Sequence, residues 1–226
     1  MSEKLLVSAD DPTITCRPYV ERLKATKNPR HRLMLQTIID HDQAEARCDI
    51  EDTMATVSDN PEYGRYWSND DIAPVGREQV REFYEALFAV GGIGNIRSDA
   101  KRLVVDDNAV VVEFMVTMVW PWWRARGLGC HLVEDDTGHY AIRRPLTTII
   151  PFDEGLKIIG EISYGGAAYW SRVPDDDVSP GYLAWVDRWL PRSGGPIADG
   201  SDDGSIGTSG TAPSSTRRRF HSADSE

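Results

Sequence analysis

Residues 37–54, TIIDHDQAEARCDIEDTM, place an imidazole and several carboxylates in a stretch with helical periodicity. The apolar face of the helix expected here comprises Leu35, just before this stretch, and Ile38, Ile39 and Ala46 within it. At about 100° per residue, Asp42 falls within that face and His41 at its edge. Burial without a counter-charge disfavours a carboxylate, so the pKa of Asp42 should rise. A carboxyl group of this kind is suited to moving a proton on a neutral organic substrate near pH 7.

Two interpretations of this pair remain open. In the first, Asp42 and His41 divide the base and acid roles of an isomerisation, an aldol-type cyclisation, a dehydration or a water activation. In the second, both residues are structural. His41 would then be a cation near a helix C-terminus. Asp42 would bind an arginine such as Arg143 or Arg144, or the backbone of a neighbouring helix.

The segments around this pair predict helices followed by strands. A helix should begin at Asn28-Pro29 and end near Arg47, because Asn caps well and Pro suits the first helical position. Asp49 should cap a second helix, with Asp52 reaching back as its capping-box partner. A third helix is expected over 76–90, with one apolar stripe made of Val80, Phe83, Tyr84, Leu87 and Phe88.

The second half of the chain has the residue types of an antiparallel sheet. Strands are expected over 96–105, 109–120, 140–152 and 156–170, a loop over 121–139, and a last helix over 179–190. Helices followed by a strand meander indicate the α+β class, with N-terminal helices packed on one strongly curved sheet.

The chain divides by composition into four parts. We expect an N-terminal extension (1–28), an α+β domain (29–172), a C-terminal helix (173–190) and a disordered tail (191–226). The tail has 36 residues, of which 20 are Gly, Ser, Thr or Pro, and it has too few large apolar side chains to form a core.

Bulk properties exclude several classes of function. A formal charge of −11 and a pI near 4.9 argue against binding to nucleic acid or an anionic membrane, because those partners need a basic surface. Three dispersed cysteines resemble neither a disulfide framework nor a zinc site. Without a membrane-length apolar run or a signal-like start, a cytoplasmic protein is expected.

Other kinds of chemistry find little support. His41 and Glu45 are spaced like two metal ligands on a helix, but no third ligand has suitable spacing, so no metal is expected. The segment GGIGN lacks the features of a phosphate loop, and no Ser or Cys lies in a nucleophile elbow. We therefore expect no cofactor.

Three segments carry a family resemblance: DHDQAEARCDIEDTMATVSDNPEYGRYW, GREQVREFYEALF and IIPFDEGLKIIGEISYG. Their order and spacing resemble SnoaL-like proteins of the nuclear transport factor two-like superfamily. The resemblance covers roughly residues 30–172 and implies a cone-shaped sheet with an internal apolar pocket, a small hydrophobic ligand and a homodimer. The sequence departs from the family at SYGGAAYW, where Gly165 and Gly166 stand in place of the acidic residue that SnoaL-like enzymes often carry late on the final strand.

The resemblance and the residue pattern together define a candidate site. Asp42 would transfer the proton, with His41 as its helper. The substrate-binding candidates are Tyr63, Tyr66, Trp67, Tyr84, Met115 and Trp120, with Tyr66 or Tyr84 as the donor to a substrate oxygen. Glu113 and Glu161 are reserve acids, although an exterior position for Glu113 and an arginine partner for Glu161 are favoured.

The expected function is cofactor-independent acid/base catalysis on a small hydrophobic, oxygenated molecule of polyketide, steroid or terpenoid type. The alternative is a non-catalytic domain that binds a small molecule or forms a dimer, since a fold does not determine a function.

Overall fold

The computed structural model describes residues 5–65 and 73–190. The helices are α1 (Arg17–Ala25), α2 (Pro29–Ala46), α3 (Ile50–Thr56), α4 (Arg77–Ala89), α5 (Trp122–Gly127) and α6 (Pro180–Trp189), with a 3-10 turn η1 (Asp175–Asp177). The strands are β1 (Gly64–Arg65), β2 (Ile96–Val105), β3 (Ala109–Pro121), β4 (His139–Pro151), β5 (Ile162–Gly165) and β6 (Tyr169–Val173). The predicted disordered tail (191–226) lies outside the described residues.

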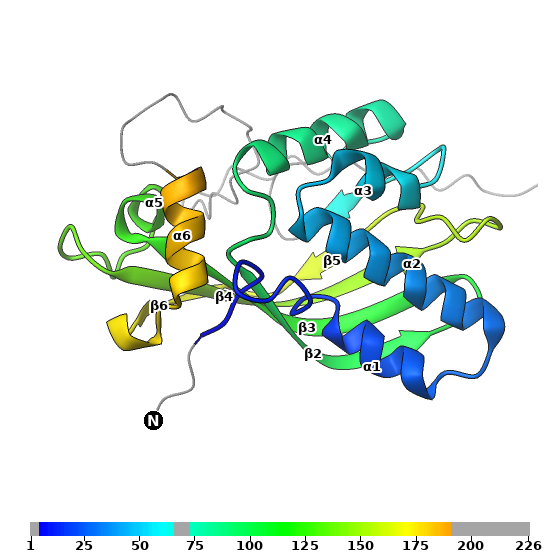
Figure 1. Cartoon of the computed structure of the whole chain (residues 1–226), viewed down its shortest axis with the longest axis horizontal. Helices are drawn as coiled ribbons and strands as arrows, with labels where there is room; N and C mark the ends of the chain where they lie inside the picture. The colour runs from blue at the N-terminus through cyan, green and yellow to red at the C-terminus, as the bar shows by residue number, and fades with distance from the viewer. Residues whose placement is uncertain (1–4, 66–72, 191–226) are drawn as a thin grey trace, which may run out of the picture.

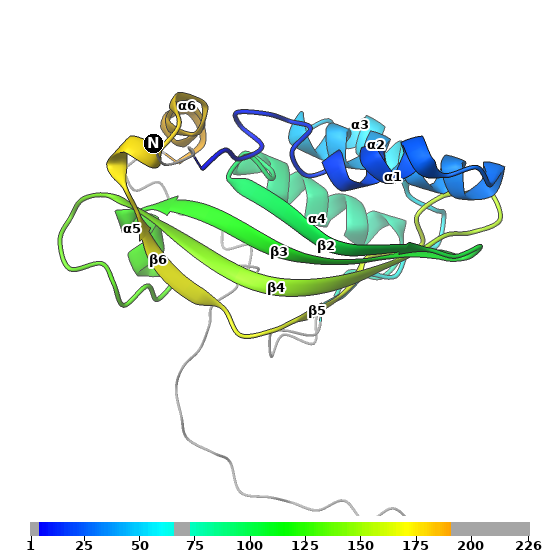
Figure 2. The same cartoon turned by 90° about the horizontal axis from the view of Figure 1, so that it is seen from below.

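The strands form one curved sheet in the order β1-β5-β4-β3-β2, and β6 pairs with β4 beyond the end of β5. All of these pairs are antiparallel except the short parallel pair of β1 and β5. Helices α1 to α4 lie on one side of the sheet (Figures 1 and 2). The α+β architecture and the sheet curvature expected from the sequence are confirmed.

Two of the predicted segments are wrong. The segment 156–170 is not one strand, because β5 and β6 pair with different parts of β4 on either side of Pro145. Proline has no N–H to donate to a neighbouring strand, which accounts for the break there. The segment 121–139 is not all loop, because α5 occupies its first residues; six residues are too few to show a helical period.

The starts of α2 and α3 follow their capping residues. The Asn28 side chain accepts hydrogen bonds from the backbone N–H groups of Arg30 and His31, with Pro29 at the first helical position. Asp49 caps α3 by accepting from the N–H of Asp52. The Asp52 carboxylate does not reach back as predicted; it binds the Arg47 guanidinium at 3.0 Å, so half of the expected capping box forms.

The main core lies between α1, α2 and the sheet. Its buried members include Cys16 and Tyr19 from the N-terminal segment, Met34, Leu35, Ile38 and Ile39 from α2, and Val110, Val112 and Ile150 from the sheet. Val112 and Ile150 therefore mark the face of β3 and β4 that α2 covers. Side chains alternate along a strand, so Glu113 and Met115 belong to the opposite face.

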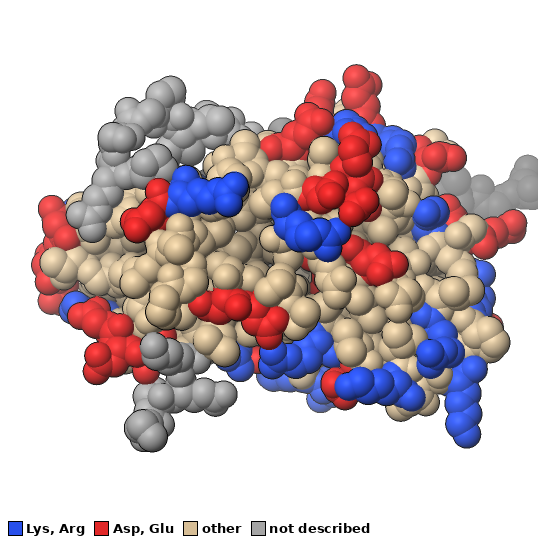
Figure 3. Space-filling model, viewed as in Figure 1, with Lys and Arg blue, Asp and Glu red and all other residues tan. Residues whose placement is uncertain are grey.

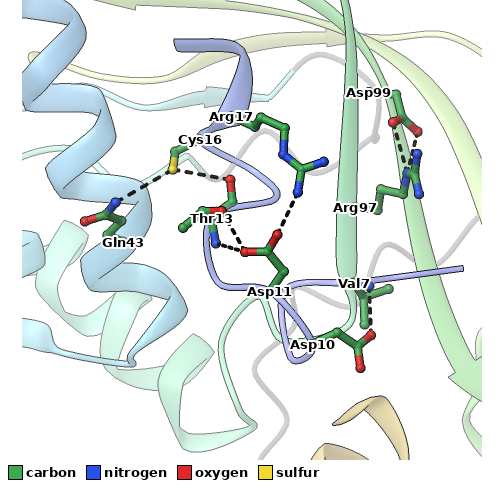
Figure 4. Close-up of polar contacts among 9 residues, drawn as sticks. All are labelled: Val7, Asp10, Asp11, Thr13, Cys16, Arg17, Gln43, Arg97 and Asp99. Atoms are coloured by element: carbon green, nitrogen blue, oxygen red, sulfur yellow. Dashed lines mark hydrogen bonds and ion pairs between the residues drawn. The ribbon is translucent and has the colours of Figure 1, made fainter. Parts of the chain in front are cut away.

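The N-terminal segment is packed against the domain. The N–H groups of Ser8 and Ala9 donate to the carbonyls of Ile96 and Gly94. Before α1, Asp11 accepts from the backbone and hydroxyl of Thr13 and pairs with Arg17 at 2.6 Å (Figure 4). Figure 4 also shows Gln43 of α2 beside the Cys16 sulfur, 4.0 Å away. Part of the predicted extension thus contributes to the core.

Helix α6 covers the end of the sheet where β3, β4 and β6 meet. Tyr182, Trp185 and Val186 form a second core with Val7, Val119, Ala141 and Val173. The indole N–H of Trp185 donates to the carbonyl of Gly91 at 2.9 Å, which ties α6 to the turn after α4. The buried side chains of this last helix therefore pack inward on the same chain.

On the face drawn in Figure 3, Asp and Glu side chains lie among Lys and Arg side chains, and neither sign covers the whole face. Among residues 5–65 and 73–190, no helix combines the length and apolar character that crossing a bilayer requires.

A single arginine joins α4 to the end of α3. The guanidinium of Arg77 donates to the carbonyls of Met54, Val57 and Ser58 at 2.7, 2.8 and 3.0 Å. These carbonyls lie at the C-terminal end of α3, where helix carbonyls lack intrahelical partners and a cation is favoured. Arg77 therefore holds the N-terminal end of α4 against the C-terminal end of α3.

Replacing Arg77 with Met should lower the free energy of unfolding by about 2 kcal/mol or more, because several charge-assisted hydrogen bonds are lost together. Chemical denaturation monitored by circular dichroism measures this loss. Arg81→Met is the matched control: Arg81 contacts Glu51 and Glu85 at the surface, so its removal should cost much less. Equal losses in the two variants would contradict the role given to Arg77.

Candidate functional site

A buried imidazole lies where α2, α3 and α4 meet. His41, in the last turns of α2, has only 1% of its surface exposed. Its Nδ1 atom lies 2.6 Å from the Thr56 hydroxyl of α3, and its Nε2 atom lies 2.9 Å from the Tyr84 hydroxyl of α4. The Tyr84 hydroxyl is in turn 2.9 Å from the hydroxyl of Tyr63. One polar chain therefore crosses an otherwise apolar interior.

Burial makes His41 a weak base. Loss of hydration lowers its pKa to about 4, although the nearby Thr53 carbonyl acts in the opposite direction. His41 is therefore neutral at pH 7. The alternative that His41 is a cation favourable to the helix dipole is therefore wrong, because the surrounding helices enclose the imidazole.

Two carboxyl groups lie beside the same imidazole. Glu45, one turn after His41 on α2, has an oxygen 3.6 Å from Nε2, and an oxygen of Glu161 lies at the same distance. The exposed fraction of the side chain rises from 1% at His41 to 13% at Glu45 and 33% at Glu161. The polar cluster thus extends from the deep interior toward the surface.

The pKa of Glu45 is raised well above the ordinary carboxyl value. Burial is the main cause, the charges of Glu161 and Asp42 add to it, and the Tyr84 hydroxyl partly offsets it. A carboxyl group in this setting holds its proton more strongly than one in water.

Asp42 also has a pKa well above the ordinary value, first because of burial and then because of the charge of Glu161. Its side chain is half-buried, and it forms no hydrogen bond or ion pair within residues 5–65 and 73–190. Arg143, one of its two suggested partners, donates to the Ser171 hydroxyl at 2.6 Å. The structure therefore agrees with the raised pKa predicted for Asp42 and not with an arginine anchor.

Helix α1 supplies further groups near the carboxyl cluster. The pKa of Tyr19 is raised by burial and then by the charges of Asp42, Glu161 and Glu45. The pKa of the Cys16 thiol is raised to about 11, by burial and then by Asp42. Both groups therefore stay protonated at neutral pH, and α1 encloses this part of the site.

The other predicted site residues divide into three groups. Tyr63 and Tyr84 join the polar chain. Tyr66 and Trp67 lie outside the described residues. Glu113 and Met115 lie on the sheet face opposite Val112, where Glu113 pairs with Arg102 at 2.6 Å, and Trp120 packs near α5 and α6. The structure therefore brings together Asp42, His41, Tyr63, Tyr84 and Glu161, and separates Glu113 and Met115 from them.

Three residues of the cluster were not predicted: Glu45, Thr56 and Tyr19. Glu45 had a detectable signal, since it follows Ile38 by seven positions and His41 by four and so shares their helix face. Thr56 and Tyr19 had none, because their contacts join different helices. In the described ranges, no group of three or more His, Cys, Asp or Glu side chains has a geometry that could hold a metal ion.

The arrangement has the components of a proton-transfer site. It holds two carboxyl groups of raised pKa, a neutral imidazole and two linked phenols, at the boundary between the core and a more exposed edge. Groups with such shifted pKa values gather at functional sites more often than elsewhere.

Comparison with known proteins gives one family match. The model of the SnoaL-like domain family matches residues 39–158, just over half of the chain. No curated protein matches this chain.

Solved structures show weaker similarity. A nuclear transport factor two-like protein from Anabaena variabilis is 16% identical, with a TM-score of 0.44 over 63% of this chain and 94% of its own. A Δ5-3-ketosteroid isomerase from Mycobacterium sp. is 12% identical, with a TM-score of 0.44 over 62% and 98%. A candidate SnoaL-like polyketide cyclase from Shewanella putrefaciens is 11% identical, with a TM-score of 0.47 over 73% and 92%.

Asp42→Asn should stabilise the protein relative to the wild type more at pH 8 than at pH 4. The folded pKa of Asp42 lies above its unfolded value, so the wild type loses stability as pH rises from the ordinary carboxyl range through the raised value. Urea denaturation at several pH values measures the difference. Asp40→Asn, at an exposed position of α2, is the control for loss of a charge. A stability difference that does not change with pH would contradict the assignment.

His41 should make the protein sensitive to acid. Its pKa is about 6.5 in the unfolded chain and about 4 in the folded one, so its contribution to stability is complete above pH 6.5 and is lost toward pH 4. The loss corresponds to about 3 kcal/mol. His41→Gln should therefore show a shallower decline in unfolding free energy over this range, whereas His131→Gln, at an exposed position, should match the wild type. Parallel curves for wild type and His41→Gln would refute this.

Proposed function

Because the chain belongs to the SnoaL-like domain family, we propose that it is a cofactor-independent acid/base enzyme. The substrate would be a small hydrophobic molecule with a carbonyl or hydroxyl oxygen, of polyketide, steroid or terpenoid type. The reaction would be an isomerisation, a cyclisation, a dehydration or a hydrolysis. Family membership supports this class of activity, and the carboxyl cluster supports the acid/base chemistry.

The observation that carries the proposal is the state of Asp42. A half-buried carboxyl group without a hydrogen bond or ion pair in the described parts of the chain is costly for folding and contributes nothing to helix anchoring. A raised pKa makes the ionised form a stronger base and brings its titration closer to neutral pH. A catalytic role for Asp42 accounts for this unfavourable burial, whereas a purely structural role does not.

Within this proposal, Asp42 removes a proton from a carbon next to a carbonyl group, or from water. The electron pair of the broken C–H bond moves toward the carbonyl oxygen, where a protonated carboxyl group donates a hydrogen bond. Glu45 is suited to that role, because its raised pKa keeps a proton available. His41 does not touch the substrate; it is 1% exposed and supports the cluster through Tyr84.

The assignment changes the role expected for Tyr84. Its hydroxyl is buried and lies within hydrogen-bond distance of both His41 and Tyr63. We therefore place Tyr84 as a positioning residue that holds His41 beside Glu45, rather than as a direct donor to a substrate oxygen. The small hydrophobic ligand and the homodimer expected from the family resemblance remain proposals.

The proposal is tested by proton exchange at carbon. The protein is incubated in D2O with a panel of hydrophobic ketones and enones, and deuterium incorporation next to the carbonyl is followed by NMR. The wild type should accelerate exchange of at least one compound by about 100-fold or more over Asp42→Asn, the usual contribution of a positioned general base.

Binding and folding are measured alongside this exchange. Asp42→Asn should keep the circular dichroism spectrum of the wild type and bind the active ketone with similar affinity. Asp40→Asn should exchange at the wild-type rate. If the wild type binds a ketone but exchanges it no faster than Asp42→Asn, the domain is a non-catalytic binder and the enzymatic proposal fails.

A further inference from the structure

The hydroxyl of Thr56 has one proton, and its partner is identifiable. Thr56 Oγ1 lies 2.6 Å from the carbonyl oxygen of Thr53, one turn earlier on α3. A carbonyl oxygen accepts hydrogen bonds and never donates them, so this short contact requires the Thr56 proton. The same Thr56 oxygen lies 2.6 Å from Nδ1 of His41. With its proton already used, Thr56 can only accept there.

The proton between these two residues must therefore belong to His41. A neutral imidazole has one N–H, and the Thr56 contact places it on Nδ1. Nε2 then has a free lone pair, and the Tyr84 hydroxyl, 2.9 Å away, donates to it.

The direction of the remaining hydrogen bond follows. Because Tyr84 gives its single proton to His41, its oxygen accepts from the Tyr63 hydroxyl at 2.9 Å. Toward Glu45, which also contacts this hydroxyl, Tyr84 can then act only as an acceptor of the proton that Glu45 retains. All four hydrogen bonds then point the same way: Tyr63 donates to Tyr84, Tyr84 to His41, His41 to Thr56, and Thr56 to the Thr53 carbonyl.

We propose that Thr56 is a positioning residue that fixes buried His41 as the Nδ1–H tautomer and thereby aligns the hydroxyl proton of Tyr84 on Nε2. The proposal deepens the proposed function, since it describes the group that organises the same carboxyl cluster. It also excludes His41 as the resting proton donor of the site, because the nitrogen that faces the cluster carries no proton.

The carboxyl groups around Nε2 bear on the same tautomer. From α2, Glu45 approaches Nε2 to 3.6 Å; from the segment before β5, Glu161 approaches to the same distance; from α4, Tyr84 approaches to 2.9 Å. A lone pair facing two ionised carboxylates would be repelled by both. A proton retained on Glu45 removes part of this repulsion, so the tautomer set by Thr56 and a protonated Glu45 support each other.

Nitrogen NMR of the full chain tests the proposal. In protein with 15N-labelled histidine at pH 7, the two ring nitrogens of His41 report which one carries the proton; His41→Gln identifies the signals among those of the five histidines. We expect a protonated Nδ1 and an unprotonated Nε2. A protonated Nε2, or an imidazolium, in the wild type overturns the proposal.

Two substitutions at Thr56 isolate the hydroxyl. Thr56→Ser keeps an oxygen able to accept from Nδ1 and should retain the wild-type tautomer. Thr56→Val keeps the shape and removes the acceptor, so the ratio of Nδ1–H to Nε2–H should fall at least about tenfold, as expected when one buried hydrogen bond is lost. An unchanged ratio in Thr56→Val overturns the role of Thr56, and the wild-type spectrum tests the tautomer even if this variant fails to fold.

The outcome is separable from that of the enzymatic proposal. The ring signals are measured without substrate, so a protein that catalyses no ketone exchange can still show the Nδ1–H tautomer, and an active enzyme can show the opposite one. In an active protein, Thr56→Val should also lower the exchange rate more than it lowers ketone affinity, whereas Thr56→Ser should restore the rate. Equal losses of rate and affinity would indicate a general structural defect and count against a positioning role.

Discussion

One buried imidazole holds the helical layer together. His41 of α2 contacts Thr56 of α3 and Tyr84 of α4, so three helices that cover the sheet share one hydrogen-bonded group. Inside a protein, each unsatisfied polar atom costs free energy, which makes such a network demanding about geometry. The helices must therefore meet at a fixed angle and depth. The carboxyl groups next to His41 occupy their positions because this junction is fixed.

The same junction concentrates unfavourable electrostatics at one edge of the core. Asp42 and Glu45 have raised pKa values because they share little water and face Glu161. A protein selected only for stability would replace such groups with apolar ones. Their presence beside a neutral histidine, where the exposed fraction of the side chains begins to rise, favours a functional site. The SnoaL-like family match covers this helix end and the strands opposite it.

The N-terminal segment adds to this environment from outside the region that carries the family resemblance. Tyr19 and Cys16 of the α1 region belong to the core cluster of α2 and lie near Asp42. They remove water from one side of the carboxyl groups, which strengthens the burial effect on their pKa values. The chemical character of α2 thus depends on a segment whose sequence shows no motif for it.

Local sequence determined what local interactions control. Asn28 and Asp49 predicted the helix starts, because a capping side chain binds backbone groups two or three residues away. The residue types of the second half of the chain predicted β2, β3 and β4. Helical periodicity also predicted that Asp42 lies on a buried face. Only the tertiary structure decided that His41 is enclosed and neutral, that Glu161 reaches it from the segment before β5, and that Thr56 orients it. Those properties depend on burial and on contacts between residues 15 to 120 positions apart, as for His41 with Thr56 and Glu161, and no local pattern encodes such distances.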